Sequence, residues 1–179
     1  MKIDIRPLNY RDSRTTEMLS LDELSNFYST CFNAEYSRFL NDSAMRDMEA
    51  WTSTSVATDL IAIDCSDTRM YAGFDEAKLV GTAVYAQRQG YVYVWAMYVH
   101  PNNIRTGIGA RLLKEIAKSV AVDSRIEVSV AKQSSGAMDF YKKNGFQTYK
   151  SKIAEVFPHV EIPIDVMQCE TSTILGLRA

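Results

Sequence analysis

The sequence contains few of the residues from which metal sites and disulfide frameworks are built. It has two histidines, His100 and His159, and three cysteines, Cys31, Cys65 and Cys169, among 179 residues. These residues form no zinc-type ligand spacing, so no metal cofactor is expected. An odd and scattered set of cysteines is typical of reduced thiols in a cytosolic protein and not of a disulfide scaffold. We therefore expect a cytoplasmic protein.

An excess of positive charge and a long apolar run are also absent from the sequence. Lysine and arginine number 20 against 22 for aspartate and glutamate, which gives a net charge of −2. Because no basic field exists to hold a polyanion, nucleic acid is not expected as a main partner. No window reaches the ~18 apolar residues of a membrane span, and the first residues, MKIDIRPLNYRD, have no apolar signal core. A membrane location is therefore not expected.

The composition that remains is that of a folded domain. Hydrophobic residues make up 46% of the chain and charged residues 23%, the balance of a globular protein. The length is sufficient to bury a substantial core. We find no internal repeat, linker or low-complexity tract, so residues 1–179 are predicted to form a single domain.

The first third of the chain predicts a strand followed by two helices. The alternation in KIDIRPL indicates a strand ended by Pro7. Ser20 and Glu23 form a capping box at the start of a helix. A second helix is expected over about residues 43–53, with poorly signalled ends. The apolar stripes of the two helices are Leu24, Phe27, Tyr28 and Cys31, then Met45, Met48 and Trp51.

From Asp67 onward, strand patterns dominate. TRMYAGF, KLVGTAVYAQ and YVYVWAMYV read as strands separated by the turns DEA and RQG. An amphipathic helix with Ile108, Leu112, Ile116 and Val120 on one side leads to the strand RIEVSVA, which makes a right-handed parallel crossover. A helix from Ser134 or Ser135 to Asn144 and a hairpin, FQTYKSK with VEIPIDVMQCE, complete the sheet. The predicted fold class is α/β, with a single mixed, largely antiparallel sheet and a central parallel strand–helix–strand crossover.

Two glycines mark the start of the helix in HPNNIRTGIGARLLKEIAKSV. A helix N-terminus offers unpaired amides and a partial positive charge, so it stabilises an anion. Gly107 and Gly109 would clear the space for phosphate oxygens to reach these amides. The pattern is neither a Rossmann fingerprint, since Leu112 stands at the third glycine position, nor a Walker A loop. The alternative is that the glycines serve tight helix–sheet packing.

The wider sequence around these glycines resembles the GNAT N-acetyltransferase superfamily. In its acetyl-coenzyme A signature a strand ends in Val-x-Pro, and Gly-x-Gly opens a helix six residues after the proline; MYVHPNNIRTGIGARLL has this spacing from Pro101 to Gly107. IDIRPLNYRD and KLVGTAVY look like the first and third strands of the family. SSGAMDFYKKNGF resembles the second family motif, through Ala137, Tyr141, Gly145 and Phe146.

The resemblance implies an acetyl-coenzyme A site in the gap between the two parallel strands, with no metal. Pantetheine would pair with the backbone of Met97, Tyr98 and Val99. Pyrophosphate would meet the amides of Arg105, Thr106, Gly107, Ile108, Gly109 and Ala110. The family's arginine or glutamine is replaced by Ile104 and its asparagine by Ser134, which still offers a hydrogen bond.

The resemblance also implies catalytic roles. Tyr141 matches the family's general acid, which protonates the leaving thiolate; the alternative is a ring that only packs with Phe140 and Phe146. The acceptor amine must lose a proton, since a free amine has a pKa of ~10.4. Glu127 is the nearest candidate base, His159 is a second, and a water chain is a third.

The function implied is transfer of the acetyl group of acetyl-coenzyme A to a primary amine by direct attack in a ternary complex. The acceptor is a small molecule or a protein and is not identified by the sequence. Alternatives are transfer of a longer acyl chain, or an acyl-coenzyme A-binding module without catalysis. Many members of the superfamily pair through late strands, so a homodimer is a further expectation.

Overall fold

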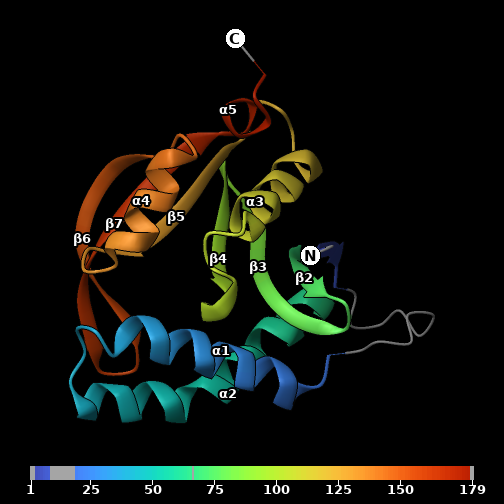
Figure 1. The fold of residues 1–179 in the computed structure, drawn as a ribbon. Helices are drawn as coiled ribbons and strands as arrows, with labels where there is room; N and C mark the ends of the chain where they lie inside the picture. The colour runs from blue at the N-terminus through green and yellow to red at the C-terminus, as the bar shows by residue number, and fades with distance from the viewer. Residues whose placement is uncertain (1–2, 9–18, 66, 178–179) are drawn as a thin grey trace.

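The computed structural model describes residues 3–8, 19–65 and 67–177, shown in Figure 1. Within these residues seven strands form one sheet in the order β1-β2-β3-β4-β5-β7-β6. Every neighbouring pair is antiparallel except β4 and β5, which are parallel and are joined through α3. The predicted fold class is confirmed.

The strands of this sheet have the following bounds: β1 Ile3–Pro7, β2 Thr68–Asp75, β3 Lys78–Arg88, β4 Tyr91–Val99, β5 Arg125–Ala131, β6 Gln147–Phe157 and β7 Val160–Glu170. The helices are α1 Leu21–Tyr36, α2 Asp42–Cys65, α3 Ile108–Ser119, α4 Ser135–Lys143 and α5 Thr171–Leu175, with a short 3₁₀ turn at Pro101–Asn103. The described part of the predicted first strand, KIDIRPL, is β1; its Lys2 lies outside the described residues.

Helix α1 begins where its capping box predicts. The Glu23 amide donates to the Ser20 hydroxyl at 3.1 Å, and the Ser20 amide donates to the Glu23 carboxylate at 2.9 Å. Two amides that the helix itself leaves unpaired are thereby satisfied. A purely local signal therefore located this helix start.

Helix α2 is about twice as long as predicted. The sequence favoured residues 43–53, and the structure continues the helix to Cys65. Thr52 lies inside this helix, and its hydroxyl donates to the carbonyl of the residue four positions earlier at 2.9 Å. Helices tolerate this arrangement. Val56 and Leu60, 0% and 6% exposed, carry the apolar face onward. Tertiary packing overrides the weak helix propensity of the TSTS run.

Helices cover both faces of the sheet. In Figure 1, α3 and α4 lie over one face, and α1 and α2 cross its lower end. The first core packs Ile108, Leu112 and Ile116 of α3 against β3, β4 and β5, as the helical stripe predicts. Val120, predicted as the last member of that stripe, follows the helix in extended conformation. The second core joins α1 and α2 to the opposite face.

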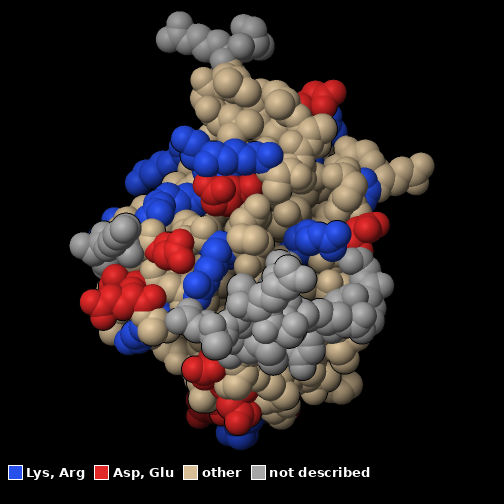
Figure 2. Space-filling model, turned by 90° about the vertical axis from the view of Figure 1, so that its right-hand side faces the viewer, with Lys and Arg blue, Asp and Glu red and all other residues tan. Residues whose placement is uncertain are grey.

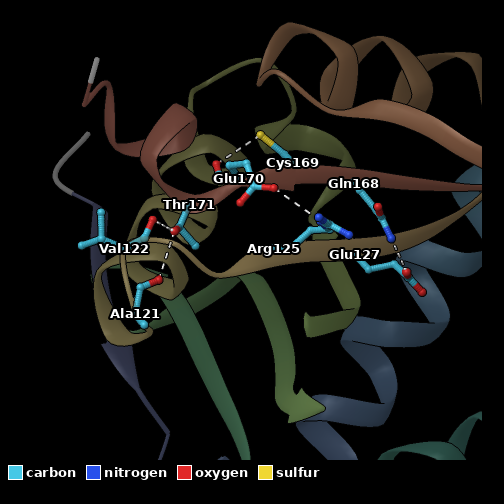
Figure 3. A network of polar contacts seen from close by, with 8 residues as sticks. All are labelled: Ala121, Val122, Arg125, Glu127, Gln168, Cys169, Glu170 and Thr171. Atoms are coloured by element: carbon cyan, nitrogen blue, oxygen red, sulfur yellow. Dashed lines mark hydrogen bonds and ion pairs between the residues drawn. The ribbon is translucent and has the colours of Figure 1, made fainter. Parts of the chain in front are cut away.

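The C-terminal hairpin is confirmed and is followed by a helix that the sequence did not predict. β6, expected over 146–152, extends to Phe157 and pairs antiparallel with β7. In the short helix α5, Thr171 donates its hydroxyl to the carbonyls of Ala121 and Val122 (Figure 3). This contact ties the end of the chain to the turn after α3.

Charged groups are mixed on the surface. On the face shown in Figure 2, acidic and basic side chains lie next to one another above the grey residues. None of the described helices has the length and apolar character that a bilayer crossing requires.

Gly81 of β3 shows how closely α3 approaches the sheet. A Cβ added there would lie 2.7 Å from Cγ2 of Ile108 and 3.2 Å from Cδ1 of Leu112. We expect Gly81→Ala to destabilise the protein by about 1–3 kcal/mol through overpacking. Thermal unfolding should then occur several degrees lower, at roughly 2–4 °C per kcal/mol for a chain of this size.

Gly136 of α4 provides the matched control for this prediction. No atom lies within 4 Å of a Cβ added at this glycine, so Gly136→Ala should be neutral or stabilise by up to about 1 kcal/mol. A Gly81→Ala protein that melts with the wild type would contradict the close approach of α3.

Candidate active site

The candidate site begins where the two parallel strands separate. β4 and β5 are paired only from Val92–Ile126 to Val94–Val128. Beyond Val94, β4 keeps its antiparallel partner β3 but no longer pairs with β5, and Figure 1 shows the strands diverging toward α1. The backbone edge of residues 95–99 on the β5 side is therefore available to an extended ligand, which can pair with it as another strand does.

A β-bulge interrupts β4 within this unpaired part. The register with β3 shifts between Thr82 and Val84, and Ala96 has a positive φ of 46°. The Thr82 hydroxyl donates to the carbonyl oxygen of Ala96 at 3.0 Å. Bulges turn side chains and backbone groups to new directions and are common beside active sites. Here the bulge places Met97 against the α3 side of the sheet.

The N-terminus of α3 lies at the end of β4. Gly107 is the N-cap residue with a left-handed φ of 86°, and no side chain caps the helix there. The first intrahelical bond runs from the Arg111 amide to the Gly107 carbonyl at 3.1 Å. The preceding amides of Ile108, Gly109 and Ala110 are those that a helix leaves unpaired, and they attract anions.

The structure requires glycine at positions 107 and 109 for different reasons. A Cβ at Gly107 would meet no atom within 4 Å, and only its positive φ requires glycine. A Cβ at Gly109 would lie 3.0 Å from the ring of Phe140 and 3.6 Å from Cε of Met97. The sequence suggested that both glycines clear space for phosphate. In the structure Gly109 serves the close packing of α3 against α4 and β4.

The neighbours of these glycines lie in the same loop. Arg105 also has a positive φ, of 63°, and the Thr106 hydroxyl donates to the Asn103 carbonyl at 2.5 Å. The Ile104 side chain is 55% exposed. The chain thus turns sharply at Arg105 just before α3. Next to this turn, the exposed residue 104 is an isoleucine, where the resemblance leads one to expect arginine or glutamine.

Tyr141, on α4, extends its side chain to the place where β4 and β5 separate. Its hydroxyl donates to Sδ of Met97 at 3.5 Å, and its ring packs edge-on against Phe140 and Phe146, each with centroids 5.1 Å away. Burial raises the pKa of Tyr141 above the ordinary value for a phenol. The phenol is therefore protonated at neutral pH and can act as a donor.

Ser134 lies between the end of β5 and the start of α4. It immediately precedes α4, is 4% exposed, and its amide donates to the carbonyl of Ala131 at the end of β5 at 3.0 Å. Its side chain makes no capping hydrogen bond to α4. Tyr98, by contrast, turns its ring toward α1, where it meets Tyr28 and Phe32 at 5.0 Å each. Only the backbone of Tyr98 therefore belongs to the open edge.

The two candidate bases lie apart from the Tyr141 hydroxyl contact. Glu127 is in the paired part of β5, opposite Tyr93, and its carboxylate accepts from Gln168 of β7 at 2.8 Å (Figure 3). His159 is exposed in the turn between β6 and β7, with a positive φ of 65°. Within the described part of the chain, neither residue forms a hydrogen bond with Met97 or Tyr141.

Sequence reasoning missed a buried carboxylate on α2. Asp59 is 7% exposed and accepts from Nε1 of Trp95 at 2.8 Å and from the Tyr28 hydroxyl at 3.4 Å. Burial raises the pKa of Asp59, against the opposing effect of these two donors. The predicted helix ended before this residue. The four-residue spacing of Val56 and Leu60 was the signal that would have extended it.

Across residues 3–8, 19–65 and 67–177, no three histidine, cysteine, aspartate or glutamate side chains gather where they could hold a metal ion. Two of the cysteines, Cys31 and Cys169, are buried free thiols. The side chain of Cys65 lies outside the described part of the structure.

Part of the chain matches a known protein family. Residues 66–148 match the family model described as Acetyltransferase (GNAT) domain. The UPF0157 protein YqkA of Bacillus subtilis (strain 168) is 32% identical over 78 residues, which are 43% of this chain. The match covers 23% of the length of that relative.

Solved structures share the fold over nearly the full chain. The PaiA N-acetyltransferase from Thermoplasma acidophilum, in complex with coenzyme A, is 18% identical with a TM-score of 0.71, covering 95% of this chain and 99% of that one. The ribosomal-protein-S18-alanine N-acetyltransferase from Escherichia coli is 13% identical with a TM-score of 0.67, covering 95% and 94%. At these identities the likeness concerns the fold.

Proposed function

We propose that this chain transfers the acetyl group of acetyl-coenzyme A to a primary amine, because residues 66–148 match the model of the GNAT acetyltransferase domain. The reaction is direct attack in a ternary complex. The observation that carries the proposal is the meeting of three features at the divergence of β4 and β5: an unpaired strand edge, an uncapped helix N-terminus and the Tyr141 hydroxyl.

The cosubstrate would occupy the divergence from the strand edge to the helix. Pantetheine amides pair with the backbone of Met97, Tyr98 and Val99, the segment that β5 leaves unpaired. The pyrophosphate accepts from the amides of residues 105–110, where the partial charge of the α3 N-terminus favours an anion. The Ser134 hydroxyl offers a further hydrogen bond from the α4 side. The similar PaiA structure is a complex with coenzyme A, which supports coenzyme A as the carrier of the acyl group here.

The chemistry then follows from the groups at the bulge. The neutral amine attacks the thioester carbonyl carbon, and a β4 backbone amide near Ala96 stabilises the oxyanion. The carbon–sulfur bond breaks as the intermediate collapses, and Tyr141 donates its proton to the leaving thiolate. Among the described residues, the hydrogen-bond partner of this hydroxyl is the thioether of Met97. Because a thioether is a weak acceptor, the hydroxyl can readily turn to a thiolate.

The proton of the attacking amine requires its own route. The carboxylate of Glu127 is engaged by Gln168, and His159 is exposed in the hairpin turn. We therefore favour a chain of water molecules as the route for this proton. Glu127 and His159 are the two alternative bases. The acceptor is a small-molecule or protein amine.

Two further proposals concern the setting of the protein. The buried free thiols of Cys31 and Cys169 support the proposed cytoplasmic location. β6 forms the edge of the sheet, and its Tyr149 and Ile153 are 63% and 69% exposed. An exposed edge of this kind supports the proposed homodimer through the late strands.

Coenzyme A binding and thiol release test the proposed function together. Coenzyme A at about 100 times its Kd should stabilise the fold by ~2.7 kcal/mol, which is roughly 5–10 °C in Tm at this chain length. A panel of amines with acetyl-coenzyme A should then release free thiol for at least one acceptor. An unchanged Tm at millimolar coenzyme A would contradict the site.

The same measurements separate the alternatives. Stabilisation without thiol release on any small-molecule or protein amine would favour a binding module. Faster release from a longer acyl-coenzyme A would favour transfer of that chain.

A further inference from the structure

Asp59 is a buried carboxylate that has no cationic partner among the described residues. It lies on α2 in the second core, which contains Val56, Leu60 and Leu24, and is 7% exposed. None of the ion pairs among the described residues includes it. Burying a carboxylate costs several kcal/mol unless its oxygens are well bonded. Because burying the Asp59 carboxylate is unfavourable, we expect a role of this residue other than packing.

The hydrogen bonds of Asp59 join three elements. Oδ1 accepts from Nε1 of Trp95 on β4 at 2.8 Å, and Oδ2 accepts from the hydroxyl of Tyr28 on α1 at 3.4 Å. The bond to the indole is the short one, and an ionised acceptor makes it stronger than a neutral one would. The carboxylate therefore fixes the orientation of the Trp95 ring relative to α2.

Trp95 immediately precedes the bulge of the candidate site. Ala96 has a φ of 46°, a left-handed conformation that costs a non-glycine residue about 1–3 kcal/mol. Its carbonyl is held by the Thr82 hydroxyl at 3.0 Å. The bulge is thus restrained from β3 through Thr82 and from α2 through Asp59 and Trp95. Both restraints are side-chain hydrogen bonds, the one from Thr82 buried and the one from Trp95 to Asp59 part-buried.

We propose that Asp59 is a positioning residue for acyl transfer, which acts through the Trp95 indole to hold the β4 bulge at Ala96. The bulge directs the backbone amide toward the thioester and places Met97 beside the Tyr141 hydroxyl. Asp59 itself touches neither substrate. This inference rests on the proposed function, because the bulge matters for catalysis only if the acyl group lies beside it.

A pH effect in this part of the structure can be assigned to Asp59, because its titratable neighbours stay neutral. The titratable groups near it are Tyr28 and Cys31 of α1 and Tyr98 of β4, with Tyr36 of α1 beside Tyr98. Burial raises the pKa of all four, that of Cys31 and of Tyr36 to about 12, so they stay neutral at neutral pH. Asp59 is then the group of this cluster that changes charge on acidification. Its protonation weakens the bond to Trp95, so kcat should fall as the pH falls through the raised pKa.

Variants of the two bonded residues test the proposal. Asp59→Leu and Trp95→Phe should each lower kcat by about tenfold or more, and the double variant should be no slower than either, since both act through one bond. Asp59→Asn keeps an oxygen acceptor for the indole but removes the charge, so its kcat should have no acid limb and should stay near the lower value that the wild type reaches once Asp59 is protonated. Trp51→Phe, the matched tryptophan control, should keep wild-type kcat, because Trp51 packs on Phe157 away from the bulge.

A second readout does not depend on turnover. The chain has two tryptophans, so in the Trp51→Phe protein Trp95 is the single emitter. Its fluorescence should titrate with Asp59, and Asp59→Asn should abolish that titration. If no amine supports thiol release, the proposed function fails, and the titration together with the acetyl-coenzyme A Kd of each variant still decides whether Asp59 holds Trp95.

Three outcomes would overturn the positioning role. They are wild-type kcat in Asp59→Leu, additive losses in the double variant, and Trp95 fluorescence that does not respond to pH or to Asp59→Asn. A purely structural residue would lower Tm and leave kcat per folded molecule unchanged. Should Asp59→Leu fail to fold, Trp95→Phe and Asp59→Asn carry the test.

Discussion

Tyr141→Phe is expected to lower the turnover of acetyl-coenzyme A by about tenfold or more, since a general acid typically contributes a factor of about 10²–10⁴. The affinity for coenzyme A should be nearly unchanged. The substitution removes one oxygen and keeps the ring that packs on Phe140 and Phe146. The lost proton donor affects the departure of the thiolate and not the binding of the cofactor. Steady-state thiol release and calorimetric Kd measure the two effects separately.

Tyr85→Phe is the matched control for this substitution. Tyr85 is also buried in the first core, and its hydroxyl bonds to Ser119 at the far end of α3 at 2.8 Å. Its loss should leave turnover unchanged. Unaltered turnover in Tyr141→Phe would retire the acid role and leave Tyr141 as a packing residue. Because burial raises the pKa of Tyr141, no loss of activity from its ionisation is expected near neutral pH.

Gly107→Asp should weaken coenzyme A binding by about tenfold or more, which is at least ~1.4 kcal/mol. The substitution places a carboxylate at the N-cap of α3, where the pyrophosphate is proposed to accept from the backbone. Two such charges about 5 Å apart repel by roughly 3 kcal/mol at an effective dielectric constant near 20. The weakening should therefore be larger at low salt than at high salt. Titration calorimetry at two ionic strengths measures it.

Gly90→Asp controls for the backbone strain of this substitution. Gly90 has a φ of 85° against 86° for Gly107, and neither has an atom within 4 Å of an added Cβ. Aspartate is among the residues that tolerate this conformation best, so both variants should lose similar stability. Only Gly107→Asp should lose affinity. Equal affinities in the two variants would argue against an anion at the start of α3.

Local and periodic signals accounted for most of the fold. The Ser20 capping box and the stripe of Ile108, Leu112 and Ile116 depend on residues within one or two turns of each other. β5 shows apolar alternation and β4 a continuous apolar run. The parallel pair β4 and β5 could be predicted because a strand, a helix and a second strand in succession form a parallel crossover. The expected place of the site came from the family resemblance.

The length of α2 could not be read in this way. Its middle carries Thr52, Ser53, Thr54 and Ser55, which favour turns as readily as helix. The helix continues through them because Val56 and Leu60 are buried against α1 and the sheet. Those contacts are made with residues far away in the sequence.

The bulge at Ala96 and the reason for Gly109 were equally hidden. Alanine has no preference for positive φ, so the residue type at position 96 does not predict a left-handed conformation. Hydrogen bonds from Thr82, and from Trp95 to Asp59 of a helix 36 residues away, accompany it. Gly109 was predicted to clear space for phosphate, whereas the ring that a side chain there would meet belongs to Phe140, on another helix.

The sequence by itself determined the order of strands and helices, the crossover and the two motifs at its ends, because each depends on neighbours along the chain. Only the tertiary structure decided how far β4 and β5 stay paired, which way the bulge turns and which carboxylate lies behind it. These features depend on the packing of α1, α2 and α4 on the sheet, and packing between distant segments leaves no periodic signal in any one of them.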